Sequence, residues 1–282
     1  MSTCSHDPSK AAPQVNCNPQ LQAYYHSLES RIGYWLLLGG TRHFGYWNRD
    51  TYWPFPLSKA LRAMEDKLAE MLALPRGARV LDTGCGVGHV ALRMAQLHGL
   101  RISAIDIIDH HIEKASRNFD RSGLPKGTIA VHSCTPPRQK RYLQASTVGI
   151  LRPGGRIVLF EYDHELVENS PEDMAALVRK INKHAAMPTN DRSNPGVFKT
   201  MLENAGFEDV IVRDFSENIN PMTRLFFYLA ILPYLIVHLF GLERYFINTM
   251  AGVESYRGHG RWRYVAITAT KPGGLLEAAK TR

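Results

Sequence analysis

The stretch VLDTGCGVGHVA, which runs from Val80 to Ala91, restricts the possible folds of this chain more than any other. It passes from an apolar run through an acidic residue and a G-x-G-x-G turn into the start of an apolar-periodic helix. This order is typical of a buried strand that enters a glycine-rich loop and then a helix. Glycines let a ligand approach the backbone closely, and the helix N-terminus offers free N–H groups to an anion. The stretch therefore predicts a nucleotide-like ligand.

The spacing of the glycines distinguishes two classes of cofactor. Dinucleotide-binding loops have the pattern G-x-G-x-x-G, whereas this chain has G-x-G-x-G with Asp82 two residues before Gly84. A carboxylate at that place would repel a pyrophosphate and would suit a cationic group. An NAD-dependent oxidoreductase is therefore disfavoured and ranks third among the functions considered. The alternative to a cofactor-binding loop is that these glycines form an ordinary tight turn between strand and helix, without a ligand.

The pattern D-x-G-C-G-x-G resembles motif I of the class I S-adenosylmethionine-dependent methyltransferases. The resemblance implies that the glycines make room for S-adenosylmethionine and that Asp82 lies near its aminoacyl end. A second strand candidate ends at Asp106, about twenty residues after the loop, where an acid typically accepts hydrogen bonds from a ribose. By the same resemblance, Ile107 is expected to form a wall of the adenine pocket. The expected cofactor-binding residues are Asp82, Gly84, Cys85, Gly86, Gly88, Asp106 and Ile107.

Alternating helix and strand patterns predict an α/β fold, and the resemblance specifies a Rossmann-like class I methyltransferase fold. We expect a mostly parallel sheet with helices on both faces and an N-terminal helical cap. The expected organisation is a disordered tail over 1–20, a methyltransferase domain over 21–272 that includes an apolar insertion over 221–255, and a tail over 273–282. The helices predicted outside the loop region are 21–38, 58–72 with Ser58 as its N-cap, 171–185 and 197–205. The predicted strands include 101–106, 128–131, 157–160, 210–212 and 262–268.

Composition excludes several classes of function. The chain of 282 residues is 44% hydrophobic, which is enough for one enzyme-sized core. Its net charge of +8 is spread along the sequence without a nucleic-acid motif, so no nucleic-acid partner is expected. Four cysteines without C-x-x-C spacing disfavour a metal site and a disulfide framework. The polar N-terminal stretch shows no signal peptide, which leads us to expect an intracellular, cytoplasmic protein.

The resemblance to methyltransferases breaks after Val131. Relatives carry a fourth strand and a helix before the proline–glycine turn, which here is LRPGG at 151–155. In this chain the residues HSCTPPR follow Val131, and their prolines cannot continue a central strand. Omitting such a strand would leave its neighbours with unpaired backbone groups. The chain is either a truncated or mis-spliced version of an active enzyme or a variant that closes its sheet differently.

The aromatic loop over 40–47, together with motif I and the LRPGG turn, narrows the resemblance. With these features, the chain is similar to the sterol 24-C-methyltransferase-like family, particularly to its fungal secondary-metabolite members. That likeness implies that the loop closes over cofactor and acceptor, although these aromatic residues could equally pack the N-terminal helix onto the sheet. His43 and Glu161 are candidate general bases, or alternatively hydrogen-bonding residues. The candidates for the lid or substrate contacts are Tyr25, Phe44, Tyr46 and Trp47.

An apolar segment at 225–240 bears on the substrate. It contains no formal charge, but it is shorter than a membrane span, and Pro233 is expected to kink it. A cap of this kind could enclose a hydrophobic acceptor or touch a membrane surface peripherally, and a buried helix pair is the alternative.

These observations predict transfer of a methyl group from S-adenosylmethionine to a hydrophobic small molecule, in secondary metabolism. Oxygen, nitrogen and carbon acceptors all remain open. Because a sulfonium methyl is already electrophilic, the protein would mainly align the reactants and exclude water. The alternative from a different class is a truncated homologue that binds the cofactor without catalysis.

Overall fold

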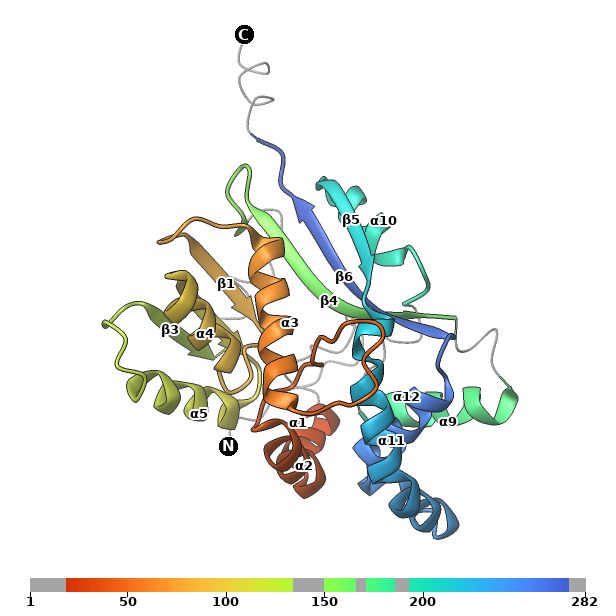
Figure 1. The fold of residues 1–282 in the computed structure, drawn as a ribbon. Helices are drawn as coiled ribbons and strands as arrows, with labels where there is room; N and C mark the ends of the chain where they lie inside the picture. Colours follow the sequence, from red (N-terminus) through yellow and green to blue (C-terminus); the bar gives the residue numbers. More distant parts are fainter. Residues whose placement is uncertain (1–18, 134–149, 166–170, 186–192, 274–282) are drawn as a thin grey trace, which may run out of the picture.

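Two three-stranded sheets form the centre of the protein (Figure 1). The computed structural model describes residues 19–133, 150–165, 171–185 and 193–273. The predicted tails and the segment after Ser133 therefore lie largely outside the described residues. The strands are β1 (Arg79–Thr83), β2 (Arg101–Asp106), β3 (Ile129–Ser133), β4 (Arg156–His164), β5 (Glu208–Asp214) and β6 (Trp262–Thr270). The helices are α1 (Pro19–His26), α2 (Leu28–Leu38), α3 (Leu57–Leu72), α4 (His89–His98), α5 (Asp109–Asp120), α9 (Glu172–His184), α10 (Val197–Asn204), α11 (Ser216–Leu239), the 3-10 helix η3 (Glu243–Tyr245) and α12 (Ile247–Arg257).

The first sheet is parallel, in the order β1-β2-β3. Its central strand β2 is the most buried, and Ala104 has no exposed surface. Met94 and Leu100 pack with Ala104 in one apolar cluster, which accounts for the apolar period of α4. This sheet places the end of β1 and the glycine loop beside the end of β2, because Asp82 is opposite Ala104 in the register.

The second sheet is antiparallel, in the order β4-β6-β5. Strands β4 and β6 pair along their full length, from Arg156 opposite Thr270 to His164 opposite Trp262. Val265 in β6 is completely buried and packs with Leu202 of α10. The expected α/β fold with a mostly parallel sheet is confirmed, and among the described strands the antiparallel pairs are those that β6 forms with β4 and β5. The chain reverses through α11 and α12 before it enters β6, so β6 runs against both of its neighbours.

The two sheets are not joined by backbone hydrogen bonds within the described residues. Strand β1 pairs only with β2, and β4 pairs only with β6, so each has one free edge in the described structure. This separation agrees with the interruption that the sequence shows after Val131.

Helix α3 holds the two sheets together (Figure 1). On one side, Arg93 of α4 binds Glu65 at 3.0 Å and Asp66 at 2.6 Å. On the other side, Met71 of α3 packs in the cluster of the second sheet, and its carbonyl accepts a hydrogen bond of 3.1 Å from Arg156. The helix begins after Pro56 without a side-chain cap, so the predicted N-cap role of Ser58 is wrong: Ser58 already lies inside the first turn.

The single helix predicted over 21–38 is two helices. The chain bends at Ser27, whose hydroxyl oxygen accepts a hydrogen bond of 3.2 Å from the backbone N–H of Ser30. This contact resembles an N-cap at the start of α2, because serine competes well for free backbone donors at such positions.

The apolar segment predicted at 225–240 belongs to the 24-residue helix α11, which contains Pro221 and Pro233 and continues past both. Tyr234 and Val237 on one side of α11 pack against Met250 and Val253 of α12. In the described part of the chain, α11 is the one helix long and apolar enough to cross a membrane by length and composition. Only 22% of its most apolar window is buried.

Candidate functional site

The glycine loop has the backbone that its sequence predicts. Gly84, Gly86 and Gly88 all have positive φ angles, of 84°, 54° and 84°. A Cβ at Gly88 would lie 2.4 Å from the ring of Phe119, whereas a Cβ at Gly84 or Gly86 would meet nothing within 4 Å. Gly88 is thus needed for packing at the start of α4. Gly84 and Gly86 leave an open cradle in which a ligand can approach the backbone.

Asp82 supplies an unsatisfied negative group beside this cradle. Its Oδ2 atom is buried and has no hydrogen-bond partner among the described residues. Burial, with a smaller contribution from the Asp106 charge, raises the pKa of Asp82 to about 6. A buried carboxylate in this condition is stabilised by an incoming cation. The site therefore fits the ammonium of the aminoacyl part of S-adenosylmethionine.

Asp106 fastens the loop to the end of β2. Its two oxygens accept hydrogen bonds of 2.8 Å each from the backbone N–H groups of Gly86 and Ile108, and His111 approaches at 3.3 Å. Burial raises the pKa of Asp106, but these hydrogen bonds and the charge of His111 outweigh it, so that the pKa lies below its usual value. An ionised acid at this place can also accept from a ribose, and that predicted role stays a prediction.

Cys85 and Ile107 complete the predicted cofactor set. Cys85 is buried, burial raises the pKa of its thiol, and its backbone N–H donates to the carbonyl of Ile105 at 3.0 Å. Ile107 is half-buried at the end of β2, and its carbonyl accepts a hydrogen bond of 3.1 Å from Gln22 of α1. The structure thus brings all seven predicted cofactor residues to the carboxyl ends of β1 and β2.

The N-terminal segment covers this loop. Tyr25 of α1 packs edge-on against His111 with ring centroids 5.4 Å apart. Thr41 Oγ1 lies 3.2 Å from Nδ1 of His89, the first residue of α4. The expected N-terminal helical cap therefore lies over the candidate cofactor site.

An apolar cavity of 450 Å³ lies between α2, α9, α11, α12 and the ends of β4 and β6. Phe226 and Pro233 of α11 and Leu37 of α2 belong to its wall. Other residues of its wall are Phe44, Leu229, Glu29, His164, Asn248, Thr249, Glu254, Ser255 and Trp262. Volume and lining are typical of a pocket for a hydrophobic small molecule.

Of the four predicted lid residues, Phe44 lines this cavity, and Tyr25 lies over the cofactor side. Trp47 is only 8% exposed; its backbone N–H donates to the carbonyl of Asn218, and its ring fills the space beside Gly45. The lid prediction is wrong for Trp47, because its indole is part of the core.

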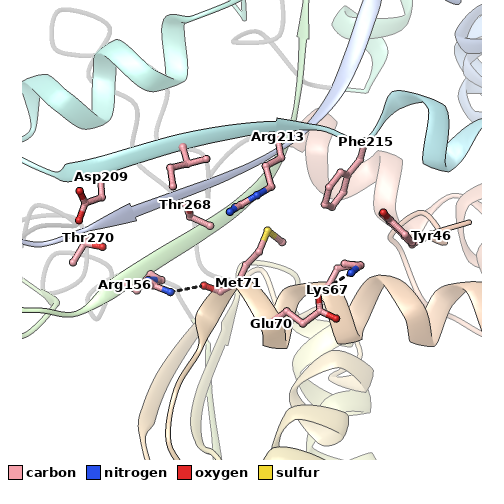
Figure 2. Close-up of a pocket in the computed structure, with 11 residues that line it drawn as sticks. Tyr46, Lys67, Glu70, Met71, Arg156, Asp209, Arg213, Phe215, Thr268 and Thr270 are labelled. Atoms are coloured by element: carbon pink, nitrogen blue, oxygen red, sulfur yellow. Dashed lines mark hydrogen bonds and ion pairs between the residues drawn. The ribbon is translucent and has the colours of Figure 1, made fainter. Parts of the chain in front are cut away.

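Tyr46 belongs to a different hollow, shown in Figure 2. Its ring packs on Phe215 with centroids 5.1 Å apart, and Lys67 lies above it. This hollow of 520 Å³ lies between α3 and the second sheet and is lined by charged residues of both signs, among them Arg156 and Arg213. Tyr46 is thus not among the residues that line the apolar cavity, and its lid role stays a prediction.

The two candidate bases are not placed in the apolar cavity. His43 uses both ring nitrogens inside the protein: Nδ1 lies 2.9 Å from the carbonyl of Phe44, and Nε2 lies 3.3 Å from Glu65. Glu161 lies inside β4 opposite Val265, and not just past the strand as predicted, because β4 continues to His164. Burial raises the pKa of Glu161. Neither residue lines the cavity, and their catalytic roles stay predictions.

Several polar residues of the cavity escaped the sequence analysis. Glu29 of α2 and Asn248 of α12 hold the N-terminal helices against α12, and His164 and Glu254 are buried in the wall. No fixed spacing or motif links these four residues. Only the alternation of β4 beyond Phe160 hinted that His164 could point into the fold.

The chain matches the family model described as a methyltransferase domain over residues 57–212. An S-adenosyl-L-methionine-dependent Diels-Alderase of Talaromyces variabilis is 41% identical, with 89% of this chain and 94% of that protein covered. A Diels-Alderase of the same description from Neonectria sp. (strain DH2) is 43% identical over 71% of this chain and 86% of the relative. The alignment with the first relative is 278 positions long, but 89% of this chain of 282 residues supplies fewer residues than that. The relative therefore has residues within the aligned region that this chain lacks.

The fold agrees with these relatives. The cyclopropane synthase MmaA2 from Mycobacterium tuberculosis superposes with a TM-score of 0.69 at 16% identity, covering 89% of this chain and 97% of that chain. The loop geometry, the unsatisfied Asp82 and these relatives all agree on S-adenosylmethionine as the cofactor. The chain belongs to the methyltransferase-domain family, in its class I S-adenosylmethionine-dependent fold, and is related within it to fungal S-adenosylmethionine-dependent Diels-Alderases.

Proposed function

We propose that this protein is an S-adenosylmethionine-dependent enzyme that promotes an intramolecular [4+2] cycloaddition of a hydrophobic linear substrate. The observation that carries the proposal is the 41% identity to a Diels-Alderase over nearly the whole of both chains. The apolar cavity supports it independently, because it offers a volume for a folded small molecule.

Such a cycloaddition needs little chemistry from the protein. Two carbon–carbon bonds form within one molecule as three π bonds become one, and no proton or group leaves. The main obstacle is the entropy of folding the diene onto the alkene, which a shaped cavity removes in advance. Phe44, Leu37 and Phe226 supply apolar walls from three separate parts of the chain. No general base is required, which is consistent with the engaged nitrogens of His43.

The cofactor would be held by the residues at the ends of β1 and β2. Asp82 would bind the ammonium, Gly84 and Gly86 would let the backbone come close, and Asp106 keeps the loop in place. When bound, S-adenosylmethionine supplies a fixed positive sulfonium charge and a transferable methyl group.

Methyl transfer to a hydrophobic oxygen, nitrogen or carbon acceptor, as in sterol 24-C-methyltransferase-like enzymes, is the second candidate. The match to a methyltransferase domain over 57–212 favours it. The same cavity would then hold the acceptor. A proton lost from the acceptor would need a base, for which His43 and Glu161 remain the candidates.

One experiment separates these functions. The protein is incubated with methyl-labelled S-adenosylmethionine and a synthetic linear polyene that carries a conjugated diene and an activated alkene. We expect a product of unchanged mass, loss of the diene absorbance and no S-adenosylhomocysteine. A product that carries the labelled methyl group would establish methyl transfer instead. Cofactor binding by calorimetry without either product would identify a homologue without catalysis on this substrate.

We also infer that the outer side of α11 rests on a lipid surface. Leu232 and Leu239 are 70% and 78% exposed, and Leu229 lies both on this outer side and in the cavity wall. A hydrophobic substrate could thus pass from lipid to cavity along one helix. Flotation with mixed neutral and anionic phospholipid vesicles should recover the wild type but not a Leu232→Ser, Leu239→Ser variant. Dimerisation by light scattering without flotation would assign this side to a second copy.

A further inference from the structure

The hollow of 520 Å³ between α3 and the second sheet has no part in the functions considered so far (Figure 2). None of the described residues that line it lines the apolar cavity, and none belongs to the glycine loop. Helix α3 packs on this sheet through Met71, and the hollow opens beside that contact over β6 and β5. It is therefore a separate place at which a small molecule can bind.

The pairing of β5 with β6 builds the floor of the hollow. Ile211 is opposite Thr268 and Arg213 is opposite Ala266, so these side chains share one face of the sheet. The register slips just before Ile211, where Asp209, with a φ of 52°, takes up the extra residue. Figure 2 shows the Arg213 side chain extending from β5 into the space between the sheet and α3.

Arg213 is a cation without a partner in this hollow. Its guanidinium makes no ion pair or hydrogen bond with another residue of the described chain. The other two cations of the wall are engaged: Lys67 binds Glu70 at 2.7 Å, and Arg156 donates to the carbonyl of Met71 at 3.1 Å. A guanidinium presents a planar set of donors that matches a carboxylate or a phosphate. Arg213 thus offers its donors to a ligand.

Thr268 places a hydroxyl on the floor beside Arg213. The residue is only 6% exposed, and its hydroxyl has no hydrogen-bond partner among the described residues. A hydroxyl buried to this extent is stabilised by a ligand that bonds to it. The acids of the wall lie elsewhere, since Glu70 is bound to Lys67 and Asp209 lies further along β5. Three cations and two acids leave the wall with one net positive charge, which favours an anion.

The rest of the hollow has apolar surface. Met71, Ile211 and Phe215 belong to its wall, and the ring of Tyr46 packs on Phe215 at one end. Ile211 is 46% exposed, so a ligand body that covers it removes apolar surface from water. The hollow therefore combines a seat for an acidic group with walls for an apolar or aromatic body.

We propose that this hollow binds a small anionic molecule whose phosphate or carboxylate head contacts Arg213 and Thr268. The guanidinium donates two parallel hydrogen bonds to the head, and the hydroxyl donates a third. The apolar body of the ligand covers Ile211, Met71 and Phe215. Because the site is separate from the apolar cavity, this proposal does not rest on the proposed function. The ligand contacts α3 and the second sheet together, so its binding stabilises the folded protein.

Binding of four probes tests the site. Phenyl phosphate and phenylacetate carry both head and body, benzyl alcohol carries the body without the charge, and inorganic phosphate carries the head alone. Calorimetry with saturating S-adenosylmethionine, which occupies the cofactor site, should show that at least one of the first two binds about tenfold or more tightly than benzyl alcohol and inorganic phosphate. Tighter binding of phenyl phosphate or of phenylacetate assigns the head as a phosphate or a carboxylate. No saturable binding, or affinities equal to that of benzyl alcohol, would overturn the proposal.

Variants then place the bound anion. Arg213→Gln should lower the affinity for the preferred anion about tenfold or more, to that of benzyl alcohol, and the isosteric Thr268→Val should lower it about threefold to tenfold. Arg121→Gln, at an exposed arginine that follows α5, removes the same charge outside the hollow and should change nothing. Unchanged S-adenosylmethionine affinity shows that each variant is folded. An anion that binds folded Arg213→Gln as tightly as the wild type would contradict the assignment, whatever the outcome for cycloaddition.

Discussion

The carboxylate of Glu29 in α2 caps the N-terminus of α12 at Thr249. It accepts hydrogen bonds of 2.7 Å from the backbone N–H and 2.8 Å from the hydroxyl of Thr249, and its other oxygen accepts from the N–H of Asn248 at 3.0 Å. An acid at a helix N-terminus satisfies free donors and interacts favourably with the helix dipole. Because α1 contacts the cofactor side through Gln22, the N-terminal helices connect the cofactor site with the wall of the apolar cavity.

Replacing Glu29 by Ala should therefore weaken both stability and substrate binding. We expect a loss of about 1–2 kcal/mol in the free energy of unfolding, as for the loss of a helix cap. Affinity for a polyene probe should fall more than affinity for S-adenosylmethionine, because Thr249 lines the cavity. Urea denaturation and calorimetry measure the two effects, with Glu203→Gln as the control because Glu203 is an exposed residue of α10. Equal losses for both ligands would contradict a role at the cavity.

Asp82→Asn should separate stability from cofactor binding. The buried carboxylate costs free energy in the free protein, because its pKa is raised to about 6. At neutral pH the amide should thus stabilise the unliganded protein by about 1–3 kcal/mol. The same change should weaken S-adenosylmethionine binding by about tenfold to a hundredfold through loss of the ion pair. Thermal unfolding with and without cofactor tests both signs, and a variant that binds S-adenosylmethionine normally would rule out the proposed ammonium contact.

The pH dependence of the wild type has a defined direction at the same residue. The folded-state pKa of Asp82 lies above its unfolded value of 3.8, so the folded protein binds more protons between pH 4 and about 6. The contribution of Asp82 to the free energy of unfolding of the unliganded protein should therefore fall as the pH rises through that window. Cofactor affinity should rise over the same window, because the ammonium binds the ionised acid. Asp82→Asn removes both trends if Asp82 is their source.

Three alanine substitutions should distinguish the roles of the glycines. Gly77 has a φ of 81°, and a Cβ there would meet nothing within 4 Å. Gly77→Ala should therefore lower the free energy of unfolding only by the cost of the left-handed backbone, about 1–2 kcal/mol. Gly88→Ala should cost about 1–3 kcal/mol more, because its Cβ would overlap Phe119. Gly86→Ala should resemble Gly77→Ala in stability but lose cofactor affinity. Normal affinity of Gly86→Ala would show that the cradle is not the cofactor site.

The cofactor half of the site could be predicted from the sequence because its residues are local. Asp82 and the glycines lie within seven residues, and the strand–loop–helix pattern fixes their geometry. The polar residues of the apolar cavity could not be predicted in this way. His164 and Glu254 are far apart in sequence, and only the folded chain brings both into the wall of one cavity.

The aromatic loop and the sheet show two other limits. Phe44, Tyr46 and Trp47 are nearly adjacent, yet they enter the apolar cavity, the second hollow and the core, because an irregular loop turns successive side chains in unrelated directions. The gap after Val131 indicated a missing strand. It did not indicate that the remaining strands form two separate sheets joined by α3, since that depends on contacts such as the one between Arg156 and Met71.

The free edges of β1 and β4 should be visible in native-state hydrogen exchange. β2 and β6 have a partner strand on each side, whereas β1 and β4 each have one among the described residues. Backbone N–H groups of β1 and β4 that point away from their partner should therefore exchange faster than those of β2 and β6, by at least about a hundredfold. Groups of β4 that face β6, such as those near Phe160 opposite Ala266, serve as the internal control because they are hydrogen-bonded. Uniform protection along β1 and β4 would mean that another part of the chain, or a second copy, pairs with these edges in solution.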